Sequence, residues 1–207
     1  MRVRRHLVIM AKIPRLGRVK RRLAADIGGI AALGFYRNSL ALVMRRLGRD
    51  RRWKCWLYVS PEGRVKTPRI SPRGITRRTQ GRGDLGARMR RPLNELPPGP
   101  VVIVGSDIPE IERWQIDAAF RTLGSHDLVF GPAKDGGYWL VGARRRPRLP
   151  PLFHNVRWSS AYALADTLAG VAPRLRVAML AELDDVDDGE SYLRWRERSQ
   201  LARFRCS

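Results

Sequence analysis

Residues 101–109, with the sequence Val-Val-Ile-Val-Gly-Ser-Asp-Ile-Pro, decide the fold that we expect. The four apolar β-branched residues follow a proline- and glycine-rich turn at 97–100. Such a run is typical of a strand buried on both faces at the centre of a parallel sheet. The strand ends just before a carboxylate, Asp107. Because ligands of open α/β sheets bind at the carboxyl ends of the strands, Asp107 is predicted to face a ligand.

The alternative role for Asp107 is to cap the helix that follows. Pro109 and the apolar Ile108 and Ile111 place the expected start of that helix several residues later. We therefore favour a functional role over capping. Gly105 adds to this, because a residue without a side chain lets the backbone approach a ligand closely.

The chain has 207 residues and no stretch that resembles a linker. We expect a single domain over residues 1–207. Its formal charge is +22, because 41 Lys and Arg residues outnumber 19 acidic ones, and such a surplus attracts anions. The arginines are spread without aromatic interleaving, so we interpret them as solvated surface. A basic nucleic-acid-binding protein with a vestigial site is accordingly ranked below an enzyme.

The cysteine pattern and the lengths of the apolar runs predict a cellular location. Cys55 and Cys206 have neither metal-ligand spacing nor the pattern of a disulfide framework, which fits a reducing compartment. No apolar run approaches the roughly 20 residues that cross a membrane. The apolar segment 7–10 is also shorter than the roughly 7 to 15 residues of a signal peptide. We predict a cytoplasmic protein without a membrane span.

Apolar patterning predicts alternating strands and helices, and hence an α/β fold with a mostly parallel sheet. Residues 60–79 are polar and rich in proline and glycine, which predicts a loop. Ser159 or Ser160 is expected to cap the helix that follows it. The predicted strands are 7–10, 53–59, 101–104, 127–130 and 176–183, and the predicted helices are 30–47, 87–96, 114–123, 162–168 and 192–204.

Two glycine-containing loops are candidates for binding phosphate. Residues 11–20 combine proline, glycine and four cations after the first strand, so they can surround a phosphate chain, although the P-loop spacing is absent. Residues 81–86 match the dinucleotide pattern Gly-x-Gly-x-x-Gly. That match is weak, because residues 75–79 before it would make a poor buried strand and the pattern belongs to a first βαβ unit.

Two further stretches carry carboxylates. Asp135-Gly136-Gly137 is predicted as a hairpin-like turn, with Asp135 either a turn former or a second carboxylate of the site. The flanking Lys134, Tyr138 and Trp139 would then wall a pocket. Residues 184–190 hold five acids in seven positions. These acids either meet the dipole of the following helix or gather around a cation.

Five motifs, in order along the chain, resemble the DUF2064 family of glycosyltransferase-like bacterial proteins. The resemblance implies a Rossmann-like GT-A fold, as in nucleotide-diphospho-sugar transferases, and distant kinship to molybdenum-cofactor and phospholactate guanylyltransferases. It also implies a divalent metal. The motifs are Met10-Ala-Lys-x-Pro-x-x-Gly-x-x-Lys-x-Arg-Leu23, Gln80-Gly-x-Gly-Asp-Leu-Gly-x-Arg-Met89, Gly105-Ser-Asp-Ile-Pro109, Gly131-Pro-Ala-x-Asp-Gly-Gly-Tyr138 and Asp185-Val-Asp187.

The resemblance also implies roles for individual residues. Asp107 and Asp187 would hold Mg²⁺ or Mn²⁺, which prefer carboxylate and phosphate oxygens. Asp107 would thereby be catalytic, and Asp135 would be the second catalytic residue, as a base or an acceptor-orienting group, with Gly136, Gly137 and Tyr138 beside it on the acceptor side. Lys12, Gly17, Lys20 and Arg22 would contact the nucleotide phosphates, and Gln80, Gly83, Asp84 and Leu85 the base and ribose.

This chain departs from the family pattern at two places. Arg21 stands where the family usually has Thr, which should alter phosphate contacts little. Asp188 and Gly189 stand where the family usually has Thr-Pro. A different turn there would re-aim Asp187 or give its role to Asp185.

We therefore expect a metal-dependent transferase that uses a nucleotide-activated donor. The first hypothesis is transfer of a glycosyl group from a nucleotide-sugar to a small acceptor, which releases a nucleoside diphosphate. The alternative is nucleotidyl transfer from an NTP, which releases pyrophosphate. The same metal clamp serves either reaction.

Overall fold

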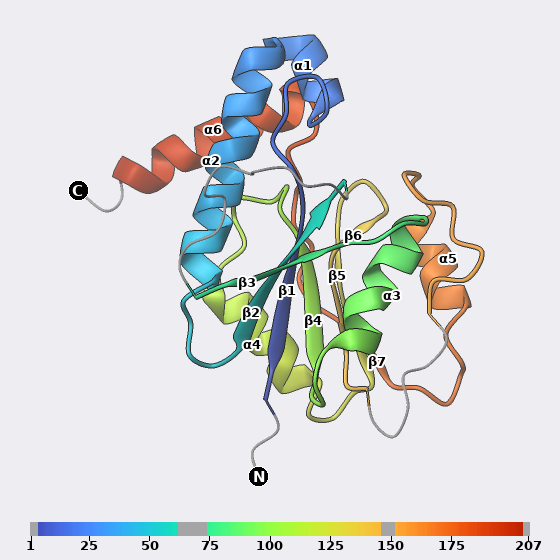
Figure 1. Cartoon of the computed structure of the whole chain (residues 1–207). Helices are drawn as coiled ribbons and strands as arrows, with labels where there is room; N and C mark the ends of the chain where they lie inside the picture. The colour runs from blue at the N-terminus through green and yellow to red at the C-terminus, as the bar shows by residue number, and fades with distance from the viewer. Residues whose placement is uncertain (1–3, 62–73, 146–151, 205–207) are drawn as a thin grey trace.

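The computed structural model describes residues 4–61, 74–145 and 152–204. A seven-stranded sheet with the order β3-β2-β1-β4-β6-β5-β7 is covered by helices on both faces (Figure 1). The elements are β1 (His6–Lys12), α1 (Arg21–Ile27), α2 (Gly29–Leu47), β2 (Lys54–Ser60), β3 (Thr76–Thr79), α3 (Leu85–Glu95), β4 (Val101–Gly105), α4 (Arg113–Thr122), β5 (Leu128–Pro132), β6 (Tyr138–Ala143), α5 (Ala163–Ala169), β7 (Val177–Met179) and α6 (Gly189–Phe204).

Strand β4 lies at the middle of the strand order, as its sequence predicts. Val101 to Val104 are almost completely buried. On one side β4 pairs in parallel with β1, and on the other it pairs antiparallel with β6. Within the described residues β6 alone runs against the other strands, so the sheet is mostly parallel, and the expected fold class is confirmed.

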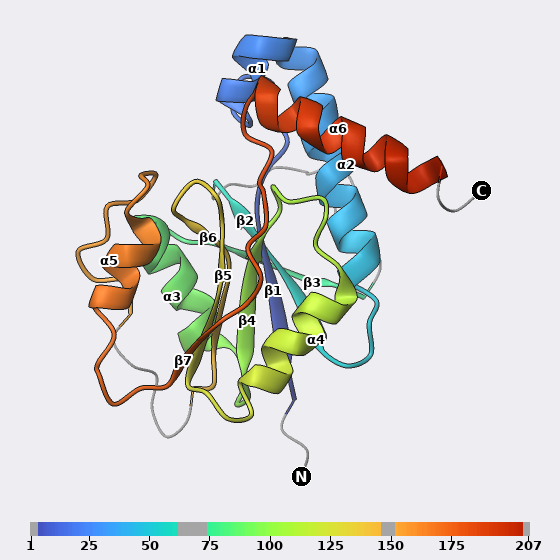
Figure 2. The same ribbon diagram turned by 180° about the vertical axis from the view of Figure 1, so that it is seen from behind.

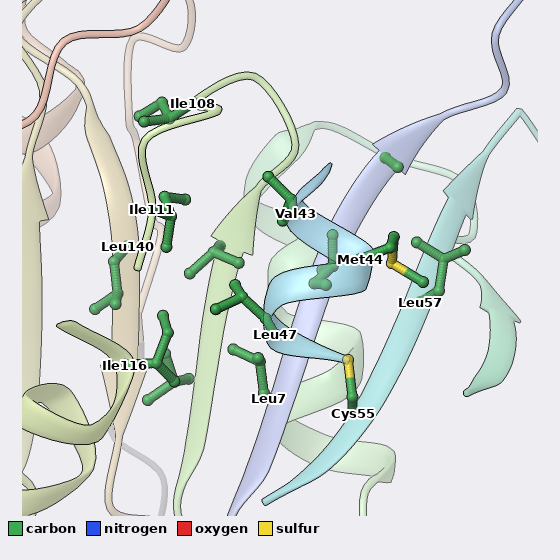
Figure 3. Close-up of a cluster of buried hydrophobic side chains, with 14 of the residues drawn as sticks. Leu7, Val43, Met44, Leu47, Cys55, Leu57, Ile108, Ile111, Ile116 and Leu140 are labelled. Atoms are coloured by element: carbon green, nitrogen blue, oxygen red, sulfur yellow. The ribbon is translucent and has the colours of Figure 1, made fainter. Parts of the chain in front are cut away.

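The helices divide between the two faces of the sheet (Figures 1 and 2). Helices α3 and α5 cover one face, and α2 and α4 cover the other. On the α2 face Val43, Met44 and Leu47 point at the sheet and pack with Leu7 of β1 and Leu57 of β2 (Figure 3). Burial on both faces explains why the central strands are continuous apolar runs instead of alternating ones.

Helices α1 and α6 extend beyond the edge of the sheet at which β1 and β4 end (Figures 1 and 2). Leu23 of α1 is fully buried against Phe35 of α2. The Phe35 ring also packs edge-on against Tyr192 and Trp195 of α6, with ring centroids 5.4 and 5.1 Å apart. This small second cluster fixes α1 and α6 above the site described below.

The structure corrects several sequence-based expectations. Part of the predicted loop 60–79 forms the edge strand β3, whose residues are mostly exposed, and residues 62–73 of that loop lie outside the described residues. Helix α1 was not predicted. The N-cap position of α5 is Tyr162, whose side chain makes no capping hydrogen bond, and not Ser159 or Ser160. The last predicted strand is shorter, because the β7 ladder covers Val177–Met179 and only a single bridge at Leu183 follows.

Arg145 is half-buried and has a structural role, unlike the solvated surface arginines expected from the sequence. Arg145 has a left-handed backbone, with φ 61°, and donates hydrogen bonds to the carbonyl oxygens of Leu93, Leu96 and Gly99. The Leu93 and Leu96 carbonyls lie at the end of α3, where helix carbonyls lack partners within the helix. Arg145 therefore closes that helix end.

Cys55 is buried in β2, and burial raises the pKa of its thiol to about 12. It is an inert core residue at neutral pH. Cys206 lies outside the described residues. In the described part of the chain, no helix has both the length and the apolar character to cross a membrane.

His6, at the start of β1, is a buried titratable group far along the strand from the site. Its side chain is almost fully covered, and the Trp56 indole N–H donates to His6 Nδ1 at 3.2 Å. Burial, and next the positive charge of Arg145, lower the pKa of His6 from 6.5 to about 4. The folded chain thus keeps this imidazole neutral at pH values at which an unfolded chain binds a proton.

This depressed pKa predicts acid sensitivity. Below pH 6.5 the His6 imidazole binds a proton in the unfolded state, whereas in the folded state it binds one only below about pH 4. The His6 contribution to the free energy of unfolding should therefore fall by about 2 to 3 kcal/mol over that range. Urea unfolding of the wild type and of His6→Asn between pH 7 and 4.5 measures the difference. Parallel pH profiles for the two proteins would contradict the assignment.

Candidate active site at the carboxyl edge of the sheet

The carboxyl ends of β1, β4, β5 and β7 all lie at one edge of the sheet, because these strands run in the same direction. Ligands of open α/β sheets bind at this edge, where the chain connections diverge to opposite sides. Here that point lies between β1 and β4. The chain after β1 carries Lys12 and Lys20, and the chain after β4 carries Asp107.

Helix α2 fixes these two loops against each other. The Tyr36 hydroxyl accepts the backbone N–H of Lys12 at 2.8 Å and donates to the Lys12 carbonyl at 2.9 Å. The same hydroxyl lies 3.2 Å from Ser106 Oγ, and Ser39 Oγ donates to the Ser106 carbonyl at 3.0 Å. Burial, and next the charge of Asp107, raise the pKa of Tyr36 above its ordinary value. Tyr36 and Ser39 therefore set the relative position of Lys12 and Asp107.

Sequence reasoning missed Tyr36 and Ser39. They lie within the predicted helix 30–47, in which only the apolar positions were considered. The available signal was their spacing, since two hydroxyl residues at positions i and i+3 share the buried face of the helix.

Lys20 joins the two carboxylates that the sequence assigns to a metal. Its ammonium lies 3.1 Å from an oxygen of Asp107 and 2.5 Å from an oxygen of Asp187. The Lys20 side chain is only 3% exposed, whereas the two carboxylates are about half exposed. Burial disfavours the charge on Lys20, but attraction to Asp107 and Asp187 outweighs it and raises the pKa of Lys20. The sequence predicted Lys20 on nucleotide phosphates and gave no hint of this pairing.

The five acids of residues 184–190 have different partners in the structure. Asp184 is buried and pairs with Lys134, Arg194 and Arg198. Asp188 accepts the Ser191 N–H at 2.8 Å at the start of α6, and Glu190 pairs with Arg194. Two acids, Asp185 and Asp187, are left to serve the site.

Asp185 lies among other carboxylates. Burial, then the negative charges of Asp187 and Asp135, raise its pKa to about 7, with Lys20 acting in the opposite direction and Asp107 adding to the rise. Asp185 thus experiences the charges of Asp107, Asp135 and Asp187 as well as that of Lys20. The hairpin turn and the acidic run, 50 residues apart in the sequence, contribute to the same site.

The turn that carries Asp135 is built by its glycines. An oxygen of Asp135 accepts the Gly137 N–H at 2.8 Å, and Gly136 adopts a φ of 80°. A Cβ on Gly136 would collide with the backbone of Ala161, so the turn packs closely on the segment before α5. The predicted hairpin between β5 and β6 is confirmed. Asp135 remains exposed with one oxygen unused by the turn.

Tyr138 and Trp139 do not wall a pocket together. Adjacent residues of a strand point to opposite faces of a sheet. Tyr138 packs beneath α5 with Phe130 and Trp158, whereas Trp139 lies in the α2 face and donates to the Ala181 carbonyl at 3.2 Å. The expectation that these two side chains wall one pocket is therefore wrong.

The predicted nucleotide-binding residues follow the carboxyl ends of β1 and β3. Lys12, Gly17 and Arg22 are exposed. Gln80 is buried, and its amide donates to the carbonyl oxygens of Ala11 and Tyr58 at 3.0 Å each, so it holds β1 and β2 together at this edge. Gly83 has a φ of 104°, Asp84 caps α3 by accepting the Ala87 N–H at 2.7 Å, and Leu85 is partly exposed.

The donor set of this edge fits a divalent cation. Asp107 and Asp187 supply hard oxygen ligands that already share one cation, the Lys20 ammonium. Mg²⁺ and Mn²⁺ are usually held by one or two carboxylates together with substrate phosphates and water. Among residues 4–61, 74–145 and 152–204, no group of three or more His, Cys, Asp or Glu side chains forms a closed metal cage. Asp107 and Asp187 by themselves would make an open site, which suits a metal carried with a nucleotide.

Comparison with known structures gives the class of the fold. A protein of Desulfovibrio desulfuricans assigned as a nucleotide-diphospho-sugar transferase shares 25% identity, with a TM-score of 0.77 and coverage of 96% of both chains. A 4-diphosphocytidyl-2C-methyl-D-erythritol synthase of Anaerococcus prevotii shares 12% identity, with a TM-score of 0.61 and coverage of 95% of this chain and 96% of that one.

A third structure is glucosyl-3-phosphoglycerate synthase of Mycobacterium tuberculosis, in complex with Mn²⁺, UDP and glucosyl-3-phosphoglycerate. It shares 12% identity, with a TM-score of 0.61 and coverage of 92% of this chain and 75% of that one. The protein thus has the GT-A-like fold of nucleotide-sugar transferases and cytidylyltransferases.

The family match is more specific than the similarity of fold. Residues 43–160, more than half of the chain, match the family described as "Uncharacterized protein conserved in bacteria (DUF2064)". The chain belongs to this family, as its motifs predict. A comparison with curated protein sequences found no significant match.

The hydrogen bonds of Tyr36 predict its importance for stability. Tyr36→Phe leaves the Lys12 and Ser106 polar groups without their buried partner, so the free energy of unfolding should fall by about 2 to 3 kcal/mol. Tyr162→Phe is the control, because Tyr162 is 55% exposed, and it should change stability by less than about 0.5 kcal/mol. Chemical unfolding measures both. Equal effects of the two variants would contradict the proposed positioning by Tyr36.

Proposed function

We propose that the protein is a metal-dependent transferase that uses a nucleotide-activated donor and moves a glycosyl group to a small acceptor. One observation carries the proposal: Asp107 and Asp187, from distant parts of the chain, share one cation at the edge of the sheet at which nucleotides bind in this fold. The Mn²⁺ and UDP bound by glucosyl-3-phosphoglycerate synthase, which shares the fold, support a divalent metal and a nucleotide-sugar.

Each group of the site has a role in this reaction. Asp107 and Asp187 would hold the cation, which when bound neutralises charge that develops on the diphosphate leaving group. Lys12 and Arg22, both exposed beside the site, would contact the phosphates. Gly17 and Gly83 let the backbone of their loops approach the nucleotide. Gln80, Asp84 and Leu85 would border the base and ribose.

Asp135 acts on the acceptor side, with Gly136, Gly137 and Tyr138 shaping the turn beside it. The acceptor hydroxyl attacks the anomeric carbon, the bond from this carbon to the diphosphate oxygen breaks, and a nucleoside diphosphate leaves. The hydroxyl proton passes to the Asp135 oxygen that the turn does not use. Asp135 is exposed, so a small acceptor can reach it.

Nucleotidyl transfer is the second candidate, and the fold shared with a cytidylyl-transferring synthase favours it. In that reaction an acceptor oxygen attacks the α-phosphate of an NTP and pyrophosphate leaves. The cation and the phosphate-binding residues act in the same way in both reactions. The released product distinguishes them: a nucleoside diphosphate indicates glycosyl transfer, and pyrophosphate indicates nucleotidyl transfer.

Metal-dependent binding tests the proposal directly. Isothermal titration with UDP-, GDP- and TDP-sugars and with GTP and CTP, in Mn²⁺ and in EDTA, should show one nucleotide bound in Mn²⁺ only. Asp107→Asn should weaken that binding at least about tenfold, or about 1.4 kcal/mol, because an amide is a poorer metal ligand. Asp50→Asn, in the turn between α2 and β2 and outside the site, is the control and should bind normally. Nucleotide binding unaffected by EDTA and by Asp107→Asn would overturn the proposal.

Asp135→Asn tests the acceptor side separately. The amide oxygen of Asn can still accept the Gly137 N–H, so the turn is preserved while the base is lost. With the donor identified by titration, turnover should fall about 100-fold or more at unchanged donor affinity. Steady-state rates and titration of the same preparation measure the two quantities. Undiminished turnover would exclude Asp135 as the base.

A further inference from the structure

Lys20 has a position that its sequence motif does not explain. Lys12 and Arg22, the other two cations expected on the nucleotide phosphates, are exposed. The Lys20 side chain, in contrast, is 3% exposed and points between two carboxylates. Its ammonium touches an oxygen of Asp107 at 3.1 Å and an oxygen of Asp187 at 2.5 Å. These are the two residues that fit a divalent cation.

The backbone of Lys20 is adapted to this position. It has a φ of 48° and a ψ of 52°, which is the left-handed region that residues with a side chain seldom adopt. Lys20 also immediately precedes α1, which its side chain does not cap. A disfavoured conformation persists where surrounding interactions impose it, and such positions gather at functional sites. The two ion pairs of the Lys20 ammonium are the contacts that offset this cost.

We infer that the Lys20 ammonium and the divalent cation are alternative occupants of the Asp107 and Asp187 oxygens, so that Lys20 must leave when the metal binds. The inference rests on the proposed function, since it concerns the metal of that same site. An ammonium and a divalent ion bound to the same oxygens would lie within a few ångströms of each other, and their like charges would repel strongly. Only one of them can occupy the position at a time.

The exchange gives Lys20 a second role. Once released, its ammonium remains beside the cation that displaced it and requires an anion. The donor diphosphate is the anion that the metal brings to this place. Lys20 would then bind phosphate only after exchange, and the energy of the broken ion pairs is recovered when the donor arrives. Metal and nucleotide should therefore bind more tightly together than either does alone.

The two possible roles of Lys20 predict opposite results. If Lys20 competes with the metal, removal of its charge strengthens metal binding. If Lys20 only holds the carboxylates ready for the metal, removal weakens metal binding, because Asp107 and Asp187 then repel each other and separate. The neutral substitution Lys20→Met keeps the length of the side chain and tests the sign.

The experiment is a titration of Mn²⁺ alone, without nucleotide, followed by the electron paramagnetic resonance signal of the free ion. Arg21→Met is the matched control, since Arg21 is exposed, directly follows Lys20 and its removal changes the net charge equally. Lys20→Met should bind Mn²⁺ at least about tenfold more tightly than the wild type, and Arg21→Met should stay within about threefold of it. Asp107→Asn in the Lys20→Met background should abolish the gain.

Thermal unfolding supplies a second measurement, with Lys20→Gln as a second variant. In EDTA both Lys20 variants should melt below the wild type, because the carboxylates have lost their cation. Mn²⁺ should raise the melting temperature of these variants more than that of the wild type. Equal or weaker Mn²⁺ binding by Lys20→Met, or the same Mn²⁺ shift in all proteins, would overturn the exchange. The proposed function fails separately, if Mn²⁺ has no effect on nucleotide binding by the wild type.

Discussion

Repulsion among carboxylates at the carboxyl edge of the sheet is the constraint on which the arrangement of the site depends. Asp185 experiences the negative charges of Asp187, Asp135 and Asp107 there, and burial together with these like charges raises its pKa to about 7. Such a group is stable only with a cation inside it. Lys20 is that cation in the structure. The segment around Lys20, including the left-handed turn and helix α1, can be understood as the support that delivers one ammonium to this place.

The apolar pattern predicted most of the fold, because in this sheet the pattern reports burial. Strands β1, β2 and β4 are covered on both faces and appear as continuous apolar runs. Strand β3 escaped prediction because its residues Thr76–Thr79 are mostly exposed, and backbone pairing with β2 holds it in place. Helix α1 escaped because it is only seven residues long and has no capping side chain at its start, so that burial of Leu23 in the tertiary structure is needed to hold it.

The candidate site was predictable where one residue follows one strand. Asp107, Asp135 and the acidic run could be placed at strand ends from sequence alone. The contacts between them could not, because they join distant segments, such as Lys20 with Asp187 and Tyr36 with Ser106. The sequence also did not show that the acids of residues 184–190 have different partners. Asp184 pairs with arginines of α6, and this pairing depends on where α6 lies in the fold.

The path of the chain after β7 explains how a strand at the edge of the sheet supplies a residue to its centre. From β7 the chain passes Leu183, which bridges to Ala133 at the end of β5, and then crosses the carboxyl edge to reach α6 beside α1 (Figure 2). Asp185 and Asp187 lie on this crossing. Gly189 is tied to Asp26 of α1 by a hydrogen bond of 2.7 Å, which fixes the far end of the crossing.

This crossing separates the two sides of the proposed reaction. Strand β5, which precedes Asp135, lies two positions from β4 in the sheet order, or about 10 Å at the usual strand spacing. Strand β1, which precedes the phosphate-binding loop, lies on the other side of β4. A donor held between these loops with its diphosphate at Asp107 and Asp187 would present its transferable group toward Asp135. With a nucleotide-sugar as donor that group is the glycosyl residue, and with an NTP it is the nucleotidyl phosphate, so the choice between the two reactions lies in which donor the loops after β1 and β3 bind.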